Sequence, residues 1–249
     1  MSSDLPKLYL ARHGETAWTE THRHTGRTDV PLNGRGEDRA RKLGRVLSPI
    51  PFTRVFTSPL RRVARTCALA GFGEVAEIDR DLLEWDYGLC EGKTTSEIVK
   101  ERPGWEQFRD GCPDGESAQD VAGRADRFIA RVHELGGNVL AFSSGHIIRM
   151  IAARWLGLPP EAGRCFFCRP ASVGELGFEH ECRFAAQSAD HERDHARGYL
   201  DEGGLFNGNQ HVLYLLHDRR LKSGWRFRCG QGHDAGGTGV FCEPRQRDQ

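Results

Sequence analysis

The sequence lacks an excess of charge of either sign. Its 249 residues carry 35 Lys and Arg against 35 Asp and Glu, and the isoelectric point is near 7.2. Proteins that bind nucleic acid through overall charge carry a basic surplus, so we expect no nucleic-acid partner. Any anion site must therefore come from arginines that are placed locally.

Long apolar runs are also missing. No stretch approaches the length of a membrane-spanning helix, and residues 1–7 do not have the basic-then-apolar layout of a signal peptide. We therefore expect a cytoplasmic protein without a membrane partner. Eight cysteines are spaced irregularly, and in a reducing compartment we expect free thiols rather than a disulfide framework.

Apolar residues become scarce toward the end of the chain. Residues 182–249 are dense in His, Arg, Asp and Gly, with one apolar island at residues 212–216. Such a composition cannot bury much surface. We expect one domain over residues 1–180, followed by a polar C-terminal tail, 181–249, that is poorly ordered. The alternative is an irregular extra lobe.

What the sequence does contain is an alternation of strand-like and helix-like segments. Short apolar runs predict strands at residues 7–11, 54–57, 75–78, 138–142 and 171–178. Helical spacing of apolar residues between these runs predicts helices that pack on the sheet. Alternating strands and helices are typical of a three-layer α/β/α sandwich.

Local signals indicate where some helices begin. Ser58-Pro59 predicts an N-cap and a proline in the first turn of the second long helix. Ser117 and Asp120 form a capping-box pattern at the start of another. The region 82–115 is rich in Gly, Trp and acidic residues, and we expect a loop with a short helix at 95–101.

The most informative short motif is Arg12-His13-Gly14, directly after the first strand. Ligands of α/β sheets bind at the carboxyl ends of the strands, where His13 is expected. A neutral imidazole can attack phosphorus, while neighbouring guanidinium groups hold the phosphate oxygens. Arg62, in the first turn of the helix after the second strand, could reach the same edge. On its own such a triplet is weak evidence.

Further motifs follow the first one in a recognisable order. They are Thr25-Gly26, Asp29-Val30-Pro31-Leu32, Ser58-Pro59-Leu60-Arg61-Arg62, Glu84 and Glu91-Gly92. With these motifs, residues 7–178 resemble the histidine phosphatase superfamily, which includes the cofactor-dependent phosphoglycerate mutases. The resemblance implies an α/β fold with phosphatase chemistry that needs no cofactor and no metal.

The resemblance also implies a role for each matching residue. His13 would be the nucleophile that becomes phosphohistidine, between the phosphate-binding side chains of Arg12 and Arg62. Glu84 would protonate the leaving oxygen and then activate water. The residues expected to line the substrate pocket are Thr19, Thr25, Gly26, Tyr87, Ser144 and Gly145.

Several segments are similar to the sugar-bisphosphatase branch of the superfamily. They are Trp18-Thr19 and residues 25–29, 84–88 and 105–112. Members of the mutase branch usually have asparagine where Thr19 stands, and a longer basic insertion after the acid. We therefore expect a phosphatase that acts on small phosphorylated metabolites, in particular phosphosugars. A phosphoglycerate mutase is an alternative.

The chain departs from the family pattern after the fourth strand. Alignment on Gly145 and Arg149 puts Ser144 where the family has its second catalytic histidine, with His146 two positions later at a helix N-terminus. Serine can donate a hydrogen bond but lacks the charge of an imidazolium. Such a loss costs about 3 kcal/mol, or a hundredfold in rate. Two hypotheses follow: His146 partly substitutes in a slow phosphatase, or the chain binds phosphorylated ligands with negligible turnover.

Two groups of cysteines and histidines could in principle bind zinc. The first comprises Cys165, Cys168, His180 and Cys182, where two intervening phenylalanines favour packing instead. The second is His191-Glu192-Arg193-Asp194-His195, which matches a metalloprotease pattern in letters but lies in a polar tail without a third ligand. We expect neither to bind metal; the corresponding alternative function is a zinc-dependent esterase. No pattern specifies an oligomeric state.

Overall fold

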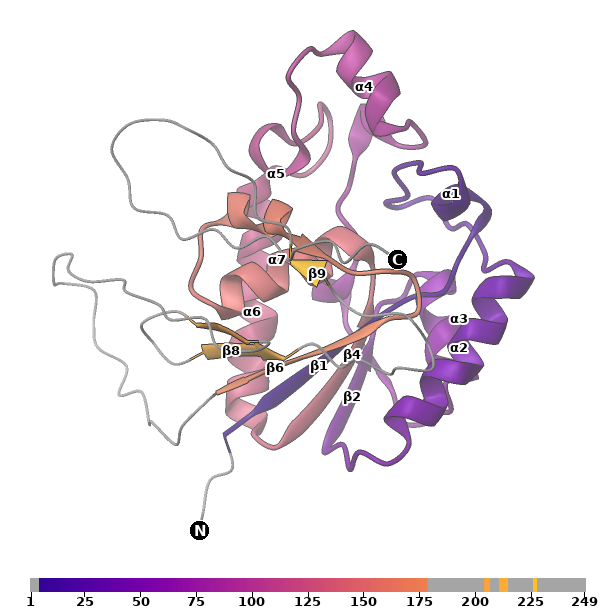
Figure 1. The fold of residues 1–249 in the computed structure, drawn as a ribbon, viewed down its shortest axis with the longest axis vertical. Helices are drawn as coiled ribbons and strands as arrows, with labels where there is room; N and C mark the ends of the chain where they lie inside the picture. The colour runs from indigo at the N-terminus through magenta and orange to yellow at the C-terminus, as the bar shows by residue number, and fades with distance from the viewer. Residues whose placement is uncertain (1–4, 179–203, 207–210, 215–225, 228–249) are drawn as a thin grey trace, which may run out of the picture.

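The fold was analysed in a computed structural model, which describes residues 5–178, 204–206, 211–214 and 226–227. Within these residues the main sheet has seven strands in the order β3-β2-β4-β1-β6-β8-β7 (Figure 1). The strands are β3 (Glu77–Ile78), β2 (Arg54–Thr57), β4 (Asn138–Ser143), β1 (Lys7–Arg12), β6 (Val173–Phe178), β8 (His211–Tyr214) and β7 (Gly204–Phe206). A separate pair joins β5 (Phe166–Phe167) to β9 (Arg226–Phe227).

Four neighbouring strands run in the same direction. β1 pairs with β4, β4 with β2 and β2 with β3, all in parallel, whereas β6 is antiparallel to β1. Arg12 at the end of β1 stands opposite Ser143 at the end of β4. The carboxyl ends of these strands therefore meet at one edge of the sheet, which is where α/β proteins place their ligands.

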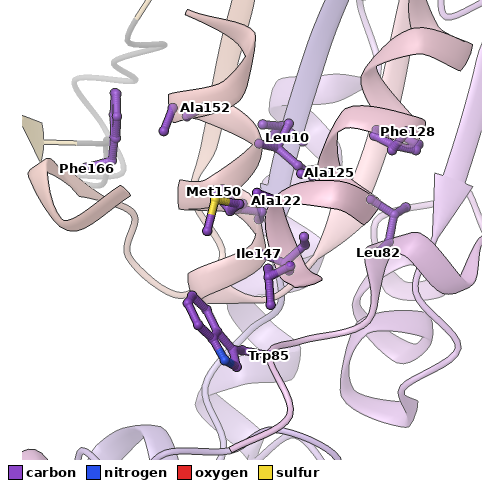
Figure 2. Close-up of a cluster of buried hydrophobic side chains, with 14 of the residues drawn as sticks. Leu10, Leu82, Trp85, Ala122, Ala125, Phe128, Ile147, Met150, Ala152 and Phe166 are labelled. Atoms are coloured by element: carbon purple, nitrogen blue, oxygen red, sulfur yellow. The ribbon is translucent and has the colours of Figure 1, made fainter. Parts of the chain in front are cut away.

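The pleat of β1 divides the core into two layers. Leu8 and Leu10 pack on one face with α6 (Ala118–Leu135) and α7 (Gly145–Trp155), and Figure 2 shows Leu10 among the side chains of these helices. Tyr9 and Ala11 face the opposite side, with α2 (Gly34–Leu47) and α3 (Arg61–Leu69). Because side chains alternate along a strand, one run builds both layers. The three-layer α/β/α fold is thereby confirmed (Figure 1).

Of the two predicted helix N-caps, one is confirmed and the other is wrong. Ser117 and Asp120 form the expected capping box at the start of α6. The N-cap prediction for Ser58 is wrong, because α3 begins at Arg61 with Leu60 at its N-cap. The N–H group of Ser58 donates to the carbonyl of Phe142. The chain thus continues the β2–β4 pairing beyond Thr57 and turns into a helix later.

The region between β3 and α6 lies beyond the carboxyl edge of the sheet. It contains η1 (Arg80–Leu82), η2 (Gly88–Cys90), α4 (Thr95–Glu101) and α5 (Gln107–Asp110), and the bounds of α4 are those expected. α1 (Ala17–Glu20) lies on the same side of the molecule as α4, while η3 (Pro160–Cys165) follows α7 (Figure 1). Trp85 and Phe108 from this region are fully buried and extend the α6–α7 core.

The predicted tail at 181–249 falls mostly outside the described residues and stays a prediction. Of this segment, β8 pairs with β6, and β7 pairs with β8. The zinc candidates His180, Cys182, His191 and His195 lie outside the described residues. Within the part of the chain that is described, no helix is long and apolar enough to cross a membrane.

Candidate active site

His13 follows the end of β1 and is hydrogen-bonded through both its backbone and its ring. Its N–H donates to the carbonyl of Ser143 (3.0 Å), and its side chain is only 2% exposed. Nδ1 lies 2.7 Å from the carbonyl oxygen of Gly14, so this nitrogen carries the proton and Nε2 keeps its lone pair. Burial, followed by the charges of Arg62 and Arg12, holds the pKa of His13 well below 6.5. The imidazole is therefore neutral at pH 7, as a nucleophile must be.

The loop after His13 is fixed through backbone contacts. The N–H of Gly14 donates to Oγ1 of Thr66 (3.1 Å), and this hydroxyl donates to the carbonyl of Arg62 (2.7 Å). A Cβ atom on Gly14 would overlap the carbonyl oxygen of Gly36 in the first turn of α2. Thr66 therefore ties the nucleophile loop to α3, and the two glycines allow it to touch α2.

Arg62 is fully buried in the first turn of α3. Its Nη1 donates to the carbonyl of Thr28 (2.9 Å), and its Nη2 donates to those of Thr25 (2.9 Å) and Gly26 (2.8 Å). Its Nε atom is buried without a hydrogen-bond partner among the described residues. An unpaired buried donor costs about 1–3 kcal/mol, and a phosphate oxygen is a strong acceptor for it.

Arg12 presents a similar arrangement from the end of β1. Its Nη1 donates to the carbonyl of Cys168 (2.7 Å), and its Nε is likewise buried and unpartnered within the described part of the chain. A Cβ atom on Gly145 would stand 3.2 Å from Cζ of Arg12. Glycine at 145 therefore lets the guanidinium lie against the beginning of α7. The charges of Arg12 and Arg62 both act on His13. Their role in holding a phosphate stays a prediction.

Glu84 contacts the N-terminus of α7 although it lies sixty residues earlier. Its Oε1 accepts from the N–H groups of Trp85 (2.9 Å) and Ile147 (3.0 Å), and its Oε2 accepts from that of His146 (3.0 Å). Helix N-termini have unsatisfied N–H groups that favour a negative charge. The carboxylate thus caps α7, and its charge also acts on the buried guanidinium of Arg62.

Ser144 itself leaves the N-terminus of α7 without a side-chain cap. Ser144 is the N-cap of α7, but its side chain caps no N–H group. It is fully buried, and its Oγ has no hydrogen-bond partner in the described structure. It follows the end of β4, next to the end of β1 at Arg12, which His13 follows. The position that the resemblance gives to a histidine therefore holds one neutral hydroxyl group.

His146 is bound to Tyr87, with 2.6 Å between its Nδ1 and the Tyr87 hydroxyl. Burial, followed by the charges of Arg149, His24 and Arg12, holds the pKa of His146 well below 6.5. Burial and then Glu84 raise the pKa of Tyr87 well above 10, so the phenol keeps its proton. This proton has no other acceptor among the described residues and is donated to Nδ1. His146 is therefore a neutral ring that carries its proton on Nε2.

Two further residues near His146, namely His24 and Arg149, had no role predicted from the sequence. His24 is buried against the rings of Tyr87 (4.9 Å between centroids), Trp105 (5.6 Å) and His146 (5.7 Å). Burial and then Arg149 lower the pKa of His24 to about 4. Arg149 stacks on Phe108, with its Cζ 4.6 Å from the ring centroid. The only sequence signal for His24 was its position next to Thr25-Gly26.

The remaining predicted pocket residues differ in what they do. The hydroxyl and N–H of Thr19 bond to Thr16 within the capping box of α1. Thr25 and Gly26 act through carbonyl groups that bind Arg62. Their substrate contacts stay predictions.

The described cysteines and histidines do not assemble a metal site. In the described residues no group of three or more His, Cys, Asp or Glu side chains is placed to hold a metal ion. The thiol of Cys168, one of the zinc candidates, lies 3.6 Å from the carbonyl oxygen of Gly145. This thiol therefore packs beneath the start of α7.

The three-layer fold is that of an α/β protein. Its candidate site lies at the carboxyl ends of the parallel strands, where proteins of this class bind their ligands. Residues 8–190 match the family model of the histidine phosphatase superfamily (branch 1), and the chain belongs to this superfamily. The resemblance inferred from the motifs is thus confirmed.

Known relatives include phosphatases. The chain is 42% identical over 181 residues to an acid phosphatase from Mycobacterium tuberculosis, covering 71% of this chain and 89% of that protein. It is 36% identical over 191 residues to sedoheptulose 1,7-bisphosphatase from Saccharomyces cerevisiae, covering 64% and 70%. A solved structure of an open reading frame product from Mycobacterium tuberculosis aligns with a TM-score of 0.68 at 41% identity, covering 73% of this chain and 96% of that one.

Proposed function

We propose that this chain is a phosphatase that hydrolyses small phosphorylated metabolites, in particular phosphosugars, through a phosphohistidine at His13. The observation that carries the proposal is the state of His13, which is neutral, with its Nδ1 bonded to Gly14 and its Nε2 lone pair available. The buried, unpaired Nε atoms of Arg12 and Arg62 add support. The named phosphatase relatives support the reaction class.

In the first half of the reaction, Nε2 of His13 attacks phosphorus as the ester P–O bond breaks. The guanidinium groups of Arg12 and Arg62 donate to the phosphoryl oxygens, where negative charge gathers. We assign Glu84 as the acid that gives its proton to the leaving oxygen, which departs as an alcohol. To carry this proton, the side chain gives up one of the N–H bonds that it accepts from Trp85, His146 and Ile147.

In the second half, water attacks the phosphoryl group and the P–N bond breaks. Glu84, now a carboxylate, accepts the proton from water, and inorganic phosphate leaves. His13 returns to its neutral form, with Nδ1 still bonded to the carbonyl of Gly14. The cycle needs no metal and no cofactor.

Ser144 favours a second candidate function, the binding of phosphorylated ligands with negligible turnover. A neutral hydroxyl occupies the position of the second catalytic histidine. His146 is neutral and bonded to Tyr87, so it does not supply the missing positive charge. It can still donate one hydrogen bond from Nε2, which makes a slow phosphatase the better-supported alternative.

Transfer of label from a phosphosugar with radioactive phosphate tests the mechanism. We expect acid-labile, base-stable label on the wild-type chain and none on His13→Ala. His22→Asn, at an exposed histidine, is the matched control and should retain the label. Full hydrolysis by His13→Ala would show that the mechanism is wrong.

A parallel screen over phosphosugars and phosphoglycerates separates the alternatives. A pure ligand binder would be stabilised thermally by the compounds without turning them over. A mutase would return isomeric phosphoglycerates instead of inorganic phosphate. Loss of activity with a chelator would point to the zinc-dependent esterase.

A further inference from the structure

The carboxylate of Glu91 is bound to the loop that holds Arg62. Its Oε1 and Oε2 accept from the N–H of Gly26 (2.9 and 3.0 Å), and Oε1 also accepts from that of Thr28 (3.2 Å). Glu91 follows η2, which is remote in sequence from both α3 and the loop. None of the roles considered so far uses this side chain.

The two residues that bind Glu91 are the same residues that bind Arg62. Gly26 and Thr28 direct their N–H groups to the carboxylate and their carbonyl groups to the guanidinium (2.8 and 2.9 Å). The loop thus lies between an anion and a cation. One peptide group contacts both directly, because the carbonyl of Thr25 accepts from Arg62 while the N–H of Gly26 donates to Glu91, and its dipole is aligned from one to the other. Such alignment strengthens both sets of hydrogen bonds, because each end polarises the groups between them.

Close packing makes the arrangement specific to glycine at position 26. A Cβ atom there would stand 2.6 Å from Oε2 of Glu91 and 2.9 Å from Cδ2 of Tyr87. The charge of Glu91 also acts on Arg62, where it opposes the effect of burial on the pKa of the guanidinium. Glu91 is therefore coupled to Arg62 both through the loop and through space.

We propose that Glu91 is a positioning residue that, through the backbone of Gly26 and Thr28, holds Arg62 with its Nε directed to the phosphate. The inference rests on the proposed function, because it assigns Arg62 to phosphate. Glu91 itself does not contact the substrate. Without the carboxylate of Glu91, the loop loses the three hydrogen bonds that it donates to this side chain. The carbonyl groups of Gly26 and Thr28 that bind Arg62 are then no longer fixed in position.

Binding of inorganic phosphate, measured by calorimetry on the full chain, tests this role without requiring turnover. We expect Glu91→Ala to weaken phosphate binding about tenfold, the effect of losing hydrogen bonds to a charged group. Glu91→Gln keeps one acceptor and should fall between wild type and Glu91→Ala. Asp120→Ala removes a carboxylate that accepts an N–H bond in the α6 capping box, and as the matched control it should bind like wild type.

A double-mutant cycle with Arg62→Met shows whether the effect passes through Arg62. We expect Glu91→Ala to have no further effect on phosphate binding once the guanidinium is absent. An equal loss in both backgrounds would overturn the inference, as would unchanged binding by Glu91→Ala alone. If the double variant is insoluble, the order of affinities among wild type, Glu91→Gln and Glu91→Ala decides. A wild-type chain that neither binds nor releases phosphate would contradict the proposed function itself.

Discussion

The hydroxyl of Tyr87 donates to Nδ1 of His146 across 2.6 Å and thereby decides which nitrogen of this imidazole carries a proton. Tyr87 lies in the segment that follows Glu84, whereas His146 lies in the first turn of α7. The neutral ring therefore offers an N–H donor from Nε2 and no basic nitrogen. The structure thus narrows the role of His146 to hydrogen bonding.

The first prediction concerns this tautomer. Nitrogen-15 correlation spectra of the wild-type chain at pH 7 should show His146 neutral and protonated on Nε2. Tyr87→Phe removes the donor, so we expect a mixture of tautomers and about a tenfold loss of phosphate-ester hydrolysis. A His146 signal from the Nδ1-protonated form in wild type would contradict the assignment.

The second prediction concerns stability at low pH. The pKa of buried His24 is lowered from 6.5 to about 4 by burial and then by Arg149. Below pH 6.5 the unfolded chain takes up a proton that the folded chain refuses until about pH 4. The free energy of unfolding therefore falls as pH falls through this window, by up to about 3 kcal/mol from His24.

Urea unfolding at pH 7 and pH 4.5 measures this effect. His24→Gln has no titrating ring, so we expect its free energy of unfolding to fall less between the two pH values than that of wild type. His22→Asn, at an exposed position, should follow wild type. Equal losses in His24→Gln and wild type would show that His24 does not titrate as described. His13 and His146 act in the same direction, since burial lowers the pKa of both.

The third prediction concerns Ser144. Ser144→His restores an imidazole beside the phosphate, and we expect kcat for phosphate-ester hydrolysis to rise about a hundredfold. Ser144→Ala removes only an unpaired hydroxyl and should change kcat far less. A folded Ser144→His variant with wild-type kcat would show that the missing histidine does not limit the rate.

Features encoded by neighbouring residues were predictable from the sequence. Arg54–Thr57 and Thr95–Glu101 are a strand and a helix with the expected bounds, because apolar spacing and local caps define them. Ser58 failed as a cap, since its bond to Phe142 comes from a strand eighty residues later. Sequence patterns do not contain such pairings.

The residues of the candidate site also fall into those that sequence motifs predict and those that depend on contacts between distant segments. His13, Arg12 and Arg62 belong to ordered motifs, and the structure places both charges close enough to lower the pKa of His13. The capping of α7 by Glu84 could not be predicted, because it joins a carboxylate to backbone N–H groups of a helix that begins about sixty residues later. His24 and Arg149 acquire their roles only through packing around Tyr87 and Phe108.

Gly14 and Gly36 meet through backbone atoms, with no side chain between them. The loop that carries His13 and the first turn of α2 therefore pack directly against each other, backbone to backbone. A graft of the nucleophile loop into a relative has to bring the start of α2 with it, because a side chain on either glycine would force the two segments apart. Arg39, on the exposed side of α2, also pairs with Glu15 of the same loop, so the graft has to include this ion pair as well.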